Sequence, residues 1–168
     1  EPSWNENRVA ALENRIAYLE ELLADLSETT NTESIGLIRE NAQYLSIDDA
    51  AQIGLDITGD MTIECWLKMA TLPKYYNLVW KYETDKYAYR FLLFNRNGSQ
   101  EISFDAGTTE AVVTWMPLTD IWYHLAVVYD ASTGSATFYV NGSQQGNVQA
   151  SLATSIPDTT SYLSVGGT

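Results

Sequence analysis

The amino-acid sequence predicts a mainly β fold, an antiparallel β-sandwich, with a coiled-coil helix at its N-terminal end. Up to about residue 27 the apolar residues recur every three or four positions, which is the period of a helix. From residue 35 onward, short runs alternate between apolar and polar residues, which is the period of a strand. The dipeptides Asn97-Gly98 and Asn141-Gly142 separate such runs and favour tight hairpins between antiparallel neighbours.

The helix is expected from about Trp4 to about Ser27. Ser3 and Glu6 form a capping box, which satisfies amide donors at a helix start. A polar run of poor helix propensity follows the helix and indicates a connector. The apolar positions of the helix have the a and d spacing of a coiled coil. They are Val9, Leu12, Ile16, Leu19, Leu23 and Leu26.

Charged residues flank this seam in a pattern that favours a parallel homotrimer. Arg8 and Arg15 take g positions and Glu13 and Glu20 take e positions, so each arginine reaches a glutamate of a neighbouring helix. Residues 8–13 and residues 15–20 each resemble the Arg-h-x-x-h-Glu motif of short three-stranded coiled coils, where h is an apolar residue. However, β-branched residues at position a with leucine at position d favour a coiled coil of two helices. An amphipathic helix packed on its own domain is the other alternative.

The rest of the chain predicts short strands, and no run there keeps a helical period for more than about a turn. We expect strands at Leu37–Arg39, Gln43–Ile47, Met61–Met69, Asn77–Tyr82, Tyr87–Phe94, Glu101–Asp105, Glu110–Trp115, Trp122–Asp130, Ala136–Val140, Gln144–Val148 and Tyr162–Val165.

Composition and charge exclude several classes of protein. The chain has 168 residues, about one domain, and a net charge of −13 without clustered basic residues, so it would repel nucleic acid. No stretch approaches the ~18 apolar residues of a membrane helix, so we expect no membrane insertion. A single cysteine, Cys65, cannot form an internal disulfide, and a single histidine, His124, cannot build a histidine-rich zinc site.

Three stretches resemble strands of the laminin-G-like, or concanavalin A-like, jelly-roll family. Residues 59–67 are similar to its Thr-Ile-Glu-Ala-Trp-Val strand. Residues 122–130, followed by the Tyr-Val-Asn-Gly of residues 139–142, resemble its Trp-His-His-Val-Ala strand and its next hairpin. Residues 162–167 are similar to its Leu-x-Ile-Gly-Gly strand. The resemblance spans residues 36–168 and implies a jelly roll.

The resemblance also implies roles for single residues. Trp66 and Trp122 would be core aromatics, Cys65 would fill a small-residue position, and His124 would be a packed histidine. Domains of the family continue past the Gly-Gly strand with a further hairpin. We therefore expect this domain to lack its final hairpin and to leave one sheet edge open.

These observations divide the chain into three parts. Residues 1–28 form a coiled-coil oligomerisation stalk, residues 29–35 a linker, and residues 36–168 the laminin-G-like jelly-roll domain.

Catalysis is not expected, although the same fold includes glucanases. Their carboxylates cluster at alternating positions of one strand, which places a general acid and a nucleophile on one face. Glu64 stands alone in its strand, and Asp48 and Asp49 are adjacent, so they would point to opposite sides of an extended segment. The sequence therefore predicts that the protein is not an enzyme.

Binding is the function that remains. A sugar site needs an aromatic platform and hydrogen-bonding groups, and tyrosines are dense around residues 83–86. The candidate ligand-binding residues are Tyr75, Tyr76, Tyr82, Tyr87 and Trp115. Calcium is a possible cofactor, because laminin-G-like relatives often hold it at the sandwich rim. The available oxygen donors are Asp48, Asp49, Asp105 and Asp130.

The two halves together predict a trimer, extracellular or on a virion surface, as in a viral fibre or an adhesin. A coiled-coil stalk would present three jelly-roll heads that bind a glycan or a host-cell receptor. The alternative is a structural decoration or joining protein of a fibre or filament, which contacts protein and no glycan.

Overall fold

The computed structural model describes residues 12–13, 15–17, 33–83 and 86–167. The chain forms two compact units, Glu1–Gly36 and Leu37–Thr168. In the first unit, residues 12–13 and 15–17 are helical, as the heptad pattern predicts. The other positions of the expected seam lie outside the described residues, so the coiled coil stays a prediction. These positions are Arg8, Val9, Leu19, Glu20, Leu23 and Leu26.

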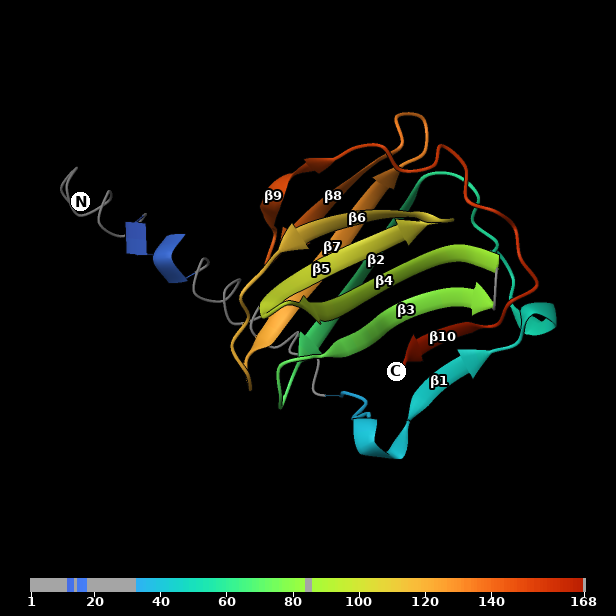
Figure 1. The fold of residues 1–168 in the computed structure, drawn as a ribbon. Coiled ribbons are helices and arrows are strands. Elements are labelled where there is room, and N and C mark those ends of the chain that lie inside the picture. Colours follow the sequence, from blue (N-terminus) through green and yellow to red (C-terminus); the bar gives the residue numbers. More distant parts are fainter. Residues whose placement is uncertain (1–11, 14, 18–32, 84–85, 168) are drawn as a thin grey trace. The chain divides into compact units, whose positions relative to one another are not determined.

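The second unit is an antiparallel sandwich of two sheets, which confirms the expected fold class (Figure 1). The six-stranded sheet has the order β1-β10-β3-β4-β5-β6, and the four-stranded sheet has the order β2-β7-β8-β9. The strands are β1 (Tyr44–Ile47), β2 (Met61–Lys68), β3 (Tyr75–Glu83), β4 (Lys86–Arg96), β5 (Ser99–Ala106), β6 (Thr109–Thr114), β7 (Trp122–Asp130), β8 (Ser135–Val140), β9 (Ser143–Gln149) and β10 (Leu163–Gly166).

The expected strand at Leu37–Arg39 is wrong. A short 3-10 turn, η1 (Arg39–Asn41), takes this place, and the amides bond locally: Asn41 donates to the Ile38 carbonyl at 3.1 Å. The Ile38 amide itself donates to the Gln43 side chain at 2.8 Å. The other expected strands are confirmed to within two residues at each end.

β1 and β2 are end strands of their sheets. The expectation that a missing final hairpin leaves one sheet edge open stays a prediction.

Both Asn-Gly turns are confirmed as hairpins. Asn97 and Gly98 have φ values of 54° and 90° between β4 and β5, and Asn141 and Gly142 have 50° and 76° between β8 and β9. Positive φ at both central positions is the signature of the type I′ turn, whose twist matches that of the flanking strands.

The core fills the space between the two sheets with alternate residues of the inner strands. From the six-stranded sheet it receives Phe91 of β4 and Phe104 of β5, and from the four-stranded sheet Leu125 of β7 and Phe138 of β8, all at 0% exposure. Because successive side chains of a strand point to opposite faces, the residues between them form the two outer faces of the sandwich.

The same alternation contradicts the roles expected for two tryptophans. Ile63, Cys65 and Leu67 of β2 pack against the core, so Trp66 between them lies on the outer face with 64% of its surface exposed. Trp122 of β7 is 45% exposed for the same reason. The expectation that they are core aromatics is therefore wrong.

A buried lysine holds the rim loops to the six-stranded sheet. Lys81 of β3 is 1% exposed, and its Nζ lies 2.8 Å from Asp49 Oδ1 and 2.8 Å from Asp56 Oδ1. It also donates to the carbonyl of Ser161 at 2.9 Å. The helical turn η2 (Asp49–Ala51), the loop after it and the segment before β10 are thus fixed by one ammonium group.

This ammonium group links folding stability to pH. The hydrogen bond from Lys81 lowers the pKa of Asp49. Burial alone would lower the pKa of Lys81, but its bonds to Asp49 and Asp56 outweigh burial and raise it. The stabilisation that the ionised Asp49 gives the folded state is complete above about pH 3.9, and it is lost as the pH falls through the lowered folded-state pKa of Asp49. The Lys81 contribution is complete below about pH 10.4 and is lost as pH rises through its raised folded-state pKa.

Replacing Lys81 with Met therefore lowers the free energy of unfolding near neutral pH, and the difference from wild type shrinks at both extremes. Urea unfolding across the pH range measures it. Lys74→Met removes an exposed lysine as the matched control and leaves the profile unchanged. If Lys81→Met lowered the free energy of unfolding by the same amount at every pH, that result would contradict the assigned ion pairs.

Candidate functional site

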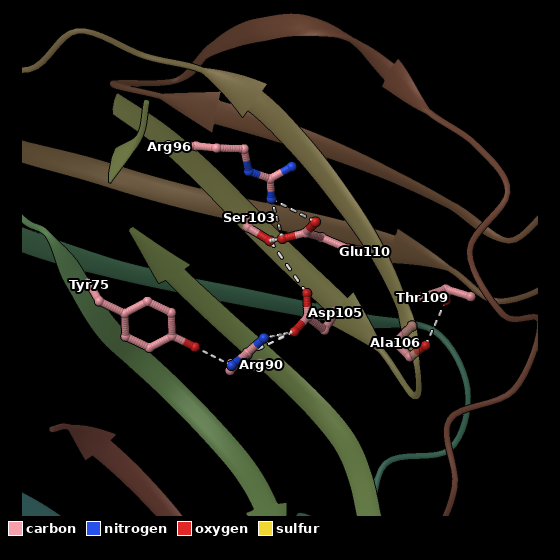
Figure 2. Close-up of polar contacts among 8 residues, drawn as sticks. All are labelled: Tyr75, Arg90, Arg96, Ser103, Asp105, Ala106, Thr109 and Glu110. Atoms are coloured by element: carbon pink, nitrogen blue, oxygen red, sulfur yellow. Dashed lines mark hydrogen bonds and ion pairs between the residues drawn. The ribbon is translucent and has the colours of Figure 1, made fainter. Parts of the chain in front are cut away.

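Charged side chains form a row across the outer face of the six-stranded sheet. Arg90 of β4 is the register partner of Asp105 of β5, and Asp105 is the register partner of Glu110 of β6. The residues beside them in each strand, such as Phe91 and Phe104, fill the core, so the three charged residues point outward. Figure 2 shows them lying together with Tyr75, Arg96 and Ser103.

The side chains of this face are joined by ion pairs and hydrogen bonds. Arg90 Nε donates to Asp105 Oδ2 at 2.7 Å, its Nη2 donates to the same oxygen, and its Nη1 donates to the Tyr75 hydroxyl. Arg96 Nη2 donates to both carboxylate oxygens of Glu110, at 3.1 and 2.9 Å. We call Arg90, Arg96, Ser103, Asp105 and Glu110 the arginine–carboxylate cluster.

Ser103 connects the two halves of the cluster. Its hydroxyl is the donor to Glu110 Oε1 at 3.1 Å and lies 3.4 Å from Asp105 Oδ1. Glu101, two residues earlier on β5, contacts the Arg96 Nε at 3.3 Å. The candidate carboxylates weighed from the sequence were Glu64, Asp48 and Asp49. That Glu101, Asp105 and Glu110 come together around two arginines was not foreseen. The alternating positions 101, 103 and 105, with residue 110 beyond a tight turn, were the signal that sequence reasoning missed.

Burial controls the electrostatics of the cluster. It raises the pKa of Asp105, and the adjacent Arg90 guanidinium limits that rise. Burial likewise raises the pKa of the Tyr75 hydroxyl. The outer pair differs, because the side chains of Arg96 and Glu110 are 49% and 38% exposed. The cluster thus has a half-buried pair, Arg90–Asp105, and an exposed pair, Arg96–Glu110.

A hollow of about 400 Å³ opens beside the cluster, lined by Arg90, Asp105, Glu110 and the turn residues Gly107–Thr109. The turn is held in place by the Gly107 amide, which donates to the Ala88 carbonyl at 2.8 Å, and by the Thr109 hydroxyl, which donates to the Ala106 carbonyl at 2.7 Å. Small-molecule sites have volumes of roughly 300–1,000 Å³. Carboxylate oxygens and guanidinium N–H groups along one wall can hydrogen-bond the hydroxyls of a ligand.

The structure separates the residues expected to bind a ligand. Tyr75 lies beside the arginine–carboxylate cluster, with the centre of its ring 5.7 Å from the Arg90 guanidinium carbon. Tyr82 stacks on Trp80 at a centroid distance of 5.6 Å. Tyr76 packs against the core, and Trp115 is a core residue at 8% exposure, so neither presents a platform on this face. The side chain of Tyr87 lies outside the described residues.

Trp80 and Tyr162 extend the aromatic part of this face and were not expected from the sequence. Trp80 is the register partner of Arg90 on one side and of Ser164 on the other. Tyr162 meets the Trp80 ring edge-on at 6.1 Å and is 39% exposed. The aromatic group Trp80, Tyr82 and Tyr162 therefore lies next to the arginine–carboxylate cluster on one sheet face.

The aspartates considered for calcium do not come together. Asp49 pairs with Lys81, Asp105 pairs with Arg90, and Asp130 accepts hydrogen bonds from Ser132 and Thr133 in its own turn. Within residues 33–83 and 86–167, as in the rest of the described chain, no three His, Cys, Asp or Glu side chains form a group that could hold a metal ion. Burial raises the pKa of the Cys65 thiol to about 11, which disfavours the reactive thiolate.

Two stacked antiparallel sheets of six and four strands define the chain as a β-sandwich protein. The chain belongs to the concanavalin A-like lectin/glucanases superfamily, whose laminin G model matches residues 39–168. No curated protein sequence matches the chain. None of the helices in the described part of the chain is long and apolar enough to cross a membrane.

Solved structures share the fold at low sequence identity. A protein from Bacteroides ovatus, described as carbohydrate-binding, superposes with a TM-score of 0.55 at 18% identity over 71% of this chain and 34% of its own. The heptameric SAP-like pentraxin of Limulus polyphemus gives 0.50 at 11% identity over 64% of this chain and 53% of its own. Domains LG4-5 of the mouse laminin alpha1 chain give 0.48 at 16% identity, over 73% and 31%. The chain thus spans about a third to a half of these proteins.

The two ion pairs of the cluster should differ in strength. A double-mutant cycle with Arg90→Met and Asp105→Asn is expected to give a coupling energy of about 1.5 to 3 kcal/mol, because the pair is half-buried and joined by charge-assisted hydrogen bonds. The matched cycle with Arg96→Met and Glu110→Gln should give a smaller value, since water and salt screen that pair. Equal couplings measured by urea unfolding would contradict the assigned difference in burial.

Proposed function

We propose that this chain is a non-catalytic glycan-binding module, presented as a trimer by an N-terminal coiled coil. The observation that carries the proposal is the outer face of the six-stranded sheet. There the aromatic group Trp80, Tyr82 and Tyr162 lies beside the arginine–carboxylate cluster and its hollow. Aromatic rings can stack on the apolar face of a pyranose while charged groups hydrogen-bond its hydroxyls. The Bacteroides ovatus protein of the same fold is described as carbohydrate-binding, which supports the class of ligand.

The charges of the chain favour a neutral glycan. The net charge of −13 disfavours nucleic acid and anionic sugars. Within the cluster each arginine is paired with a carboxylate, so no unpaired positive charge is offered to an anionic group. Sugar hydroxyl groups both donate and accept hydrogen bonds, so they can bond to the arginine and to the carboxylate of such a pair.

The N-terminal segment supports multivalent display. Leu12 and Ile16 lie in the described helical residues, and each leaves more than half of its surface exposed in the single chain (56% and 55%). A parallel coiled coil would bury both at its seam, with Arg15 and Glu13 on its flanks. Three tethered heads on one surface raise avidity by ~10² or more over a single weak site. The division into stalk 1–28, linker 29–35 and head 36–168, and an extracellular or virion-surface location, belong to this proposal.

Binding is tested with the soluble protein on a glycan array. We expect binding to neutral glycans, and Glu110→Gln should weaken it by about tenfold because the variant loses a charge-assisted hydrogen bond. Glu40→Gln removes an exposed carboxylate from η1 and should have no effect. Absence of binding to every glycan would favour the alternative, a decoration or joining protein that contacts protein alone.

The oligomeric state is tested by sedimentation equilibrium at micromolar concentration. The expected mass is that of three chains. Ile16→Asp should yield monomers, because burying three carboxylates in an apolar seam costs several kcal/mol. A wild-type monomer would contradict the trimer, and a trimeric Ile16→Asp variant would show that the heads associate without the stalk.

Enzyme activity is tested by incubating the protein with β-glucans and sialosides. We expect no turnover, since Asp105 and Glu110 are each held by an arginine and neither is a free general acid or nucleophile. Hydrolysis that disappears in Glu110→Gln would show that the cluster is catalytic.

A further inference from the structure

The outer face of the four-stranded sheet carries a second exposed aromatic surface. β2 and β7 pair so that Trp66 lies opposite His124 and Lys68 lies opposite Trp122. The alternate residues of both strands pack against the core, among them Cys65, Leu67 and Leu125. Trp66 and Trp122 therefore project together from this face, diagonal to each other across two strands, and are 64% and 45% exposed.

Polar side chains lie next to both rings. The His124 ring tilts against Trp66 at a centroid distance of 5.2 Å, and its Nε2 lies 3.4 Å from Glu64 Oε2. The Glu64 side chain is 66% exposed, so its carboxylate keeps accepting capacity toward a ligand. On the other side the Lys68 ammonium lies 5.4 Å from the centre of the Trp122 ring. An imidazole, a carboxylate and an ammonium thus border the two indoles.

The charge of this surface differs from that of the chain. Glu64 and Lys68 balance each other around the rings, whereas the whole chain carries −13. A nearly neutral aromatic surface bordered by donors and acceptors suits a ligand with an apolar face and hydroxyl edges. A pyranose ring has both, because its axial C–H groups form an apolar face and its equatorial hydroxyls point outward.

We propose that Trp66 and Trp122, with Glu64 and His124, form a second glycan-binding platform for neutral pyranose units. This inference shares its class of ligand with the proposed function, but it stands on the other sheet and uses no residue of the arginine–carboxylate cluster. The two platforms lie on opposite outer faces of one sandwich, so a single head would hold two glycan segments at once.

The test follows the indole N–H signals of the protein in ¹⁵N NMR spectra. Neutral oligosaccharides of glucose, N-acetylglucosamine, mannose and galactose are the probes, and Trp66→Phe and Trp122→Phe assign the two signals. We expect at least one probe to shift the Trp66 and Trp122 signals at millimolar concentration. Trp66→Ala should weaken that interaction by about tenfold. Because Trp66 is exposed, this variant should keep the wild-type melting temperature.

Two controls separate this platform from the other face. Tyr162→Ala removes an aromatic ring of the six-stranded sheet and should leave the Trp66 titration unchanged. Shifts confined to Trp80 would support the proposed function and overturn the second platform. Unmoved Trp66 and Trp122 signals with all four sugars would overturn it as well. Shifts of these signals with protein concentration alone, accompanied by a rise in mass, would assign the face to self-association instead.

Discussion

Side chains alternate between the two faces of each strand, and this alternation decides both what fills the core and what lies on the outer surface. Two sheets share one interior, so every second residue of a strand must be apolar enough to fill it. Phe91, Phe104, Leu125 and Phe138 meet this requirement without any exposed surface. Residues between them lie on the two outer faces, and among these Arg90 and Asp105 carry charge and Trp66 exposes an aromatic ring. Core and candidate sites are therefore complementary halves of the same strands.

The two outer faces differ in chemistry although they follow from one rule. The six-stranded sheet places Arg90, Asp105 and Glu110 in one row, next to the rings of Trp80 and Tyr82. The four-stranded sheet exposes Trp66 and Trp122, bordered by Glu64 and Lys68, whose charges balance. A hydrogen-bonding site and a stacking platform on one small domain would let each head bind glycan at two points. Trimeric display would multiply this effect through effective concentration, without new contacts.

Much of the fold could be predicted from the sequence because its determinants are local. Period-two runs and the Asn-Gly dipeptides locate the strands and hairpins, and the positive φ values of Asn97 and Asn141 confirm the turns. The strand predicted at residues 37–39 was wrong, because the Ile38 amide donates a hydrogen bond to the Gln43 side chain in a local turn. The sequence pattern does not reveal this bond. Trp66 was misplaced for a different reason. Its expected role came from the family resemblance, while the alternation of Ile63, Cys65 and Leu67 already indicated an outward position.

The candidate sites depend on register between strands, which local patterns leave open. Arg90 and Asp105 are fifteen residues apart in the chain and become neighbours only through the β4–β5 pairing. Lys81 likewise meets Asp49 across a separation of 32 residues. Tyr75 was predicted as a ligand-binding residue from the density of tyrosines, and the structure places it against Arg90. The density of tyrosines in the sequence does not predict that Arg90 is the partner of Tyr75.

Calorimetric titration of the protein with an oligosaccharide that it binds counts the sites on each chain, and so tests whether both outer faces bind glycan. With one platform on each outer face, the stoichiometry is two oligosaccharides per chain. Trp66→Ala and Glu110→Gln should each weaken one of the two sites by about tenfold and leave the other at its wild-type affinity. A single site per chain that survives both substitutions would place recognition elsewhere on the sandwich and would contradict the account.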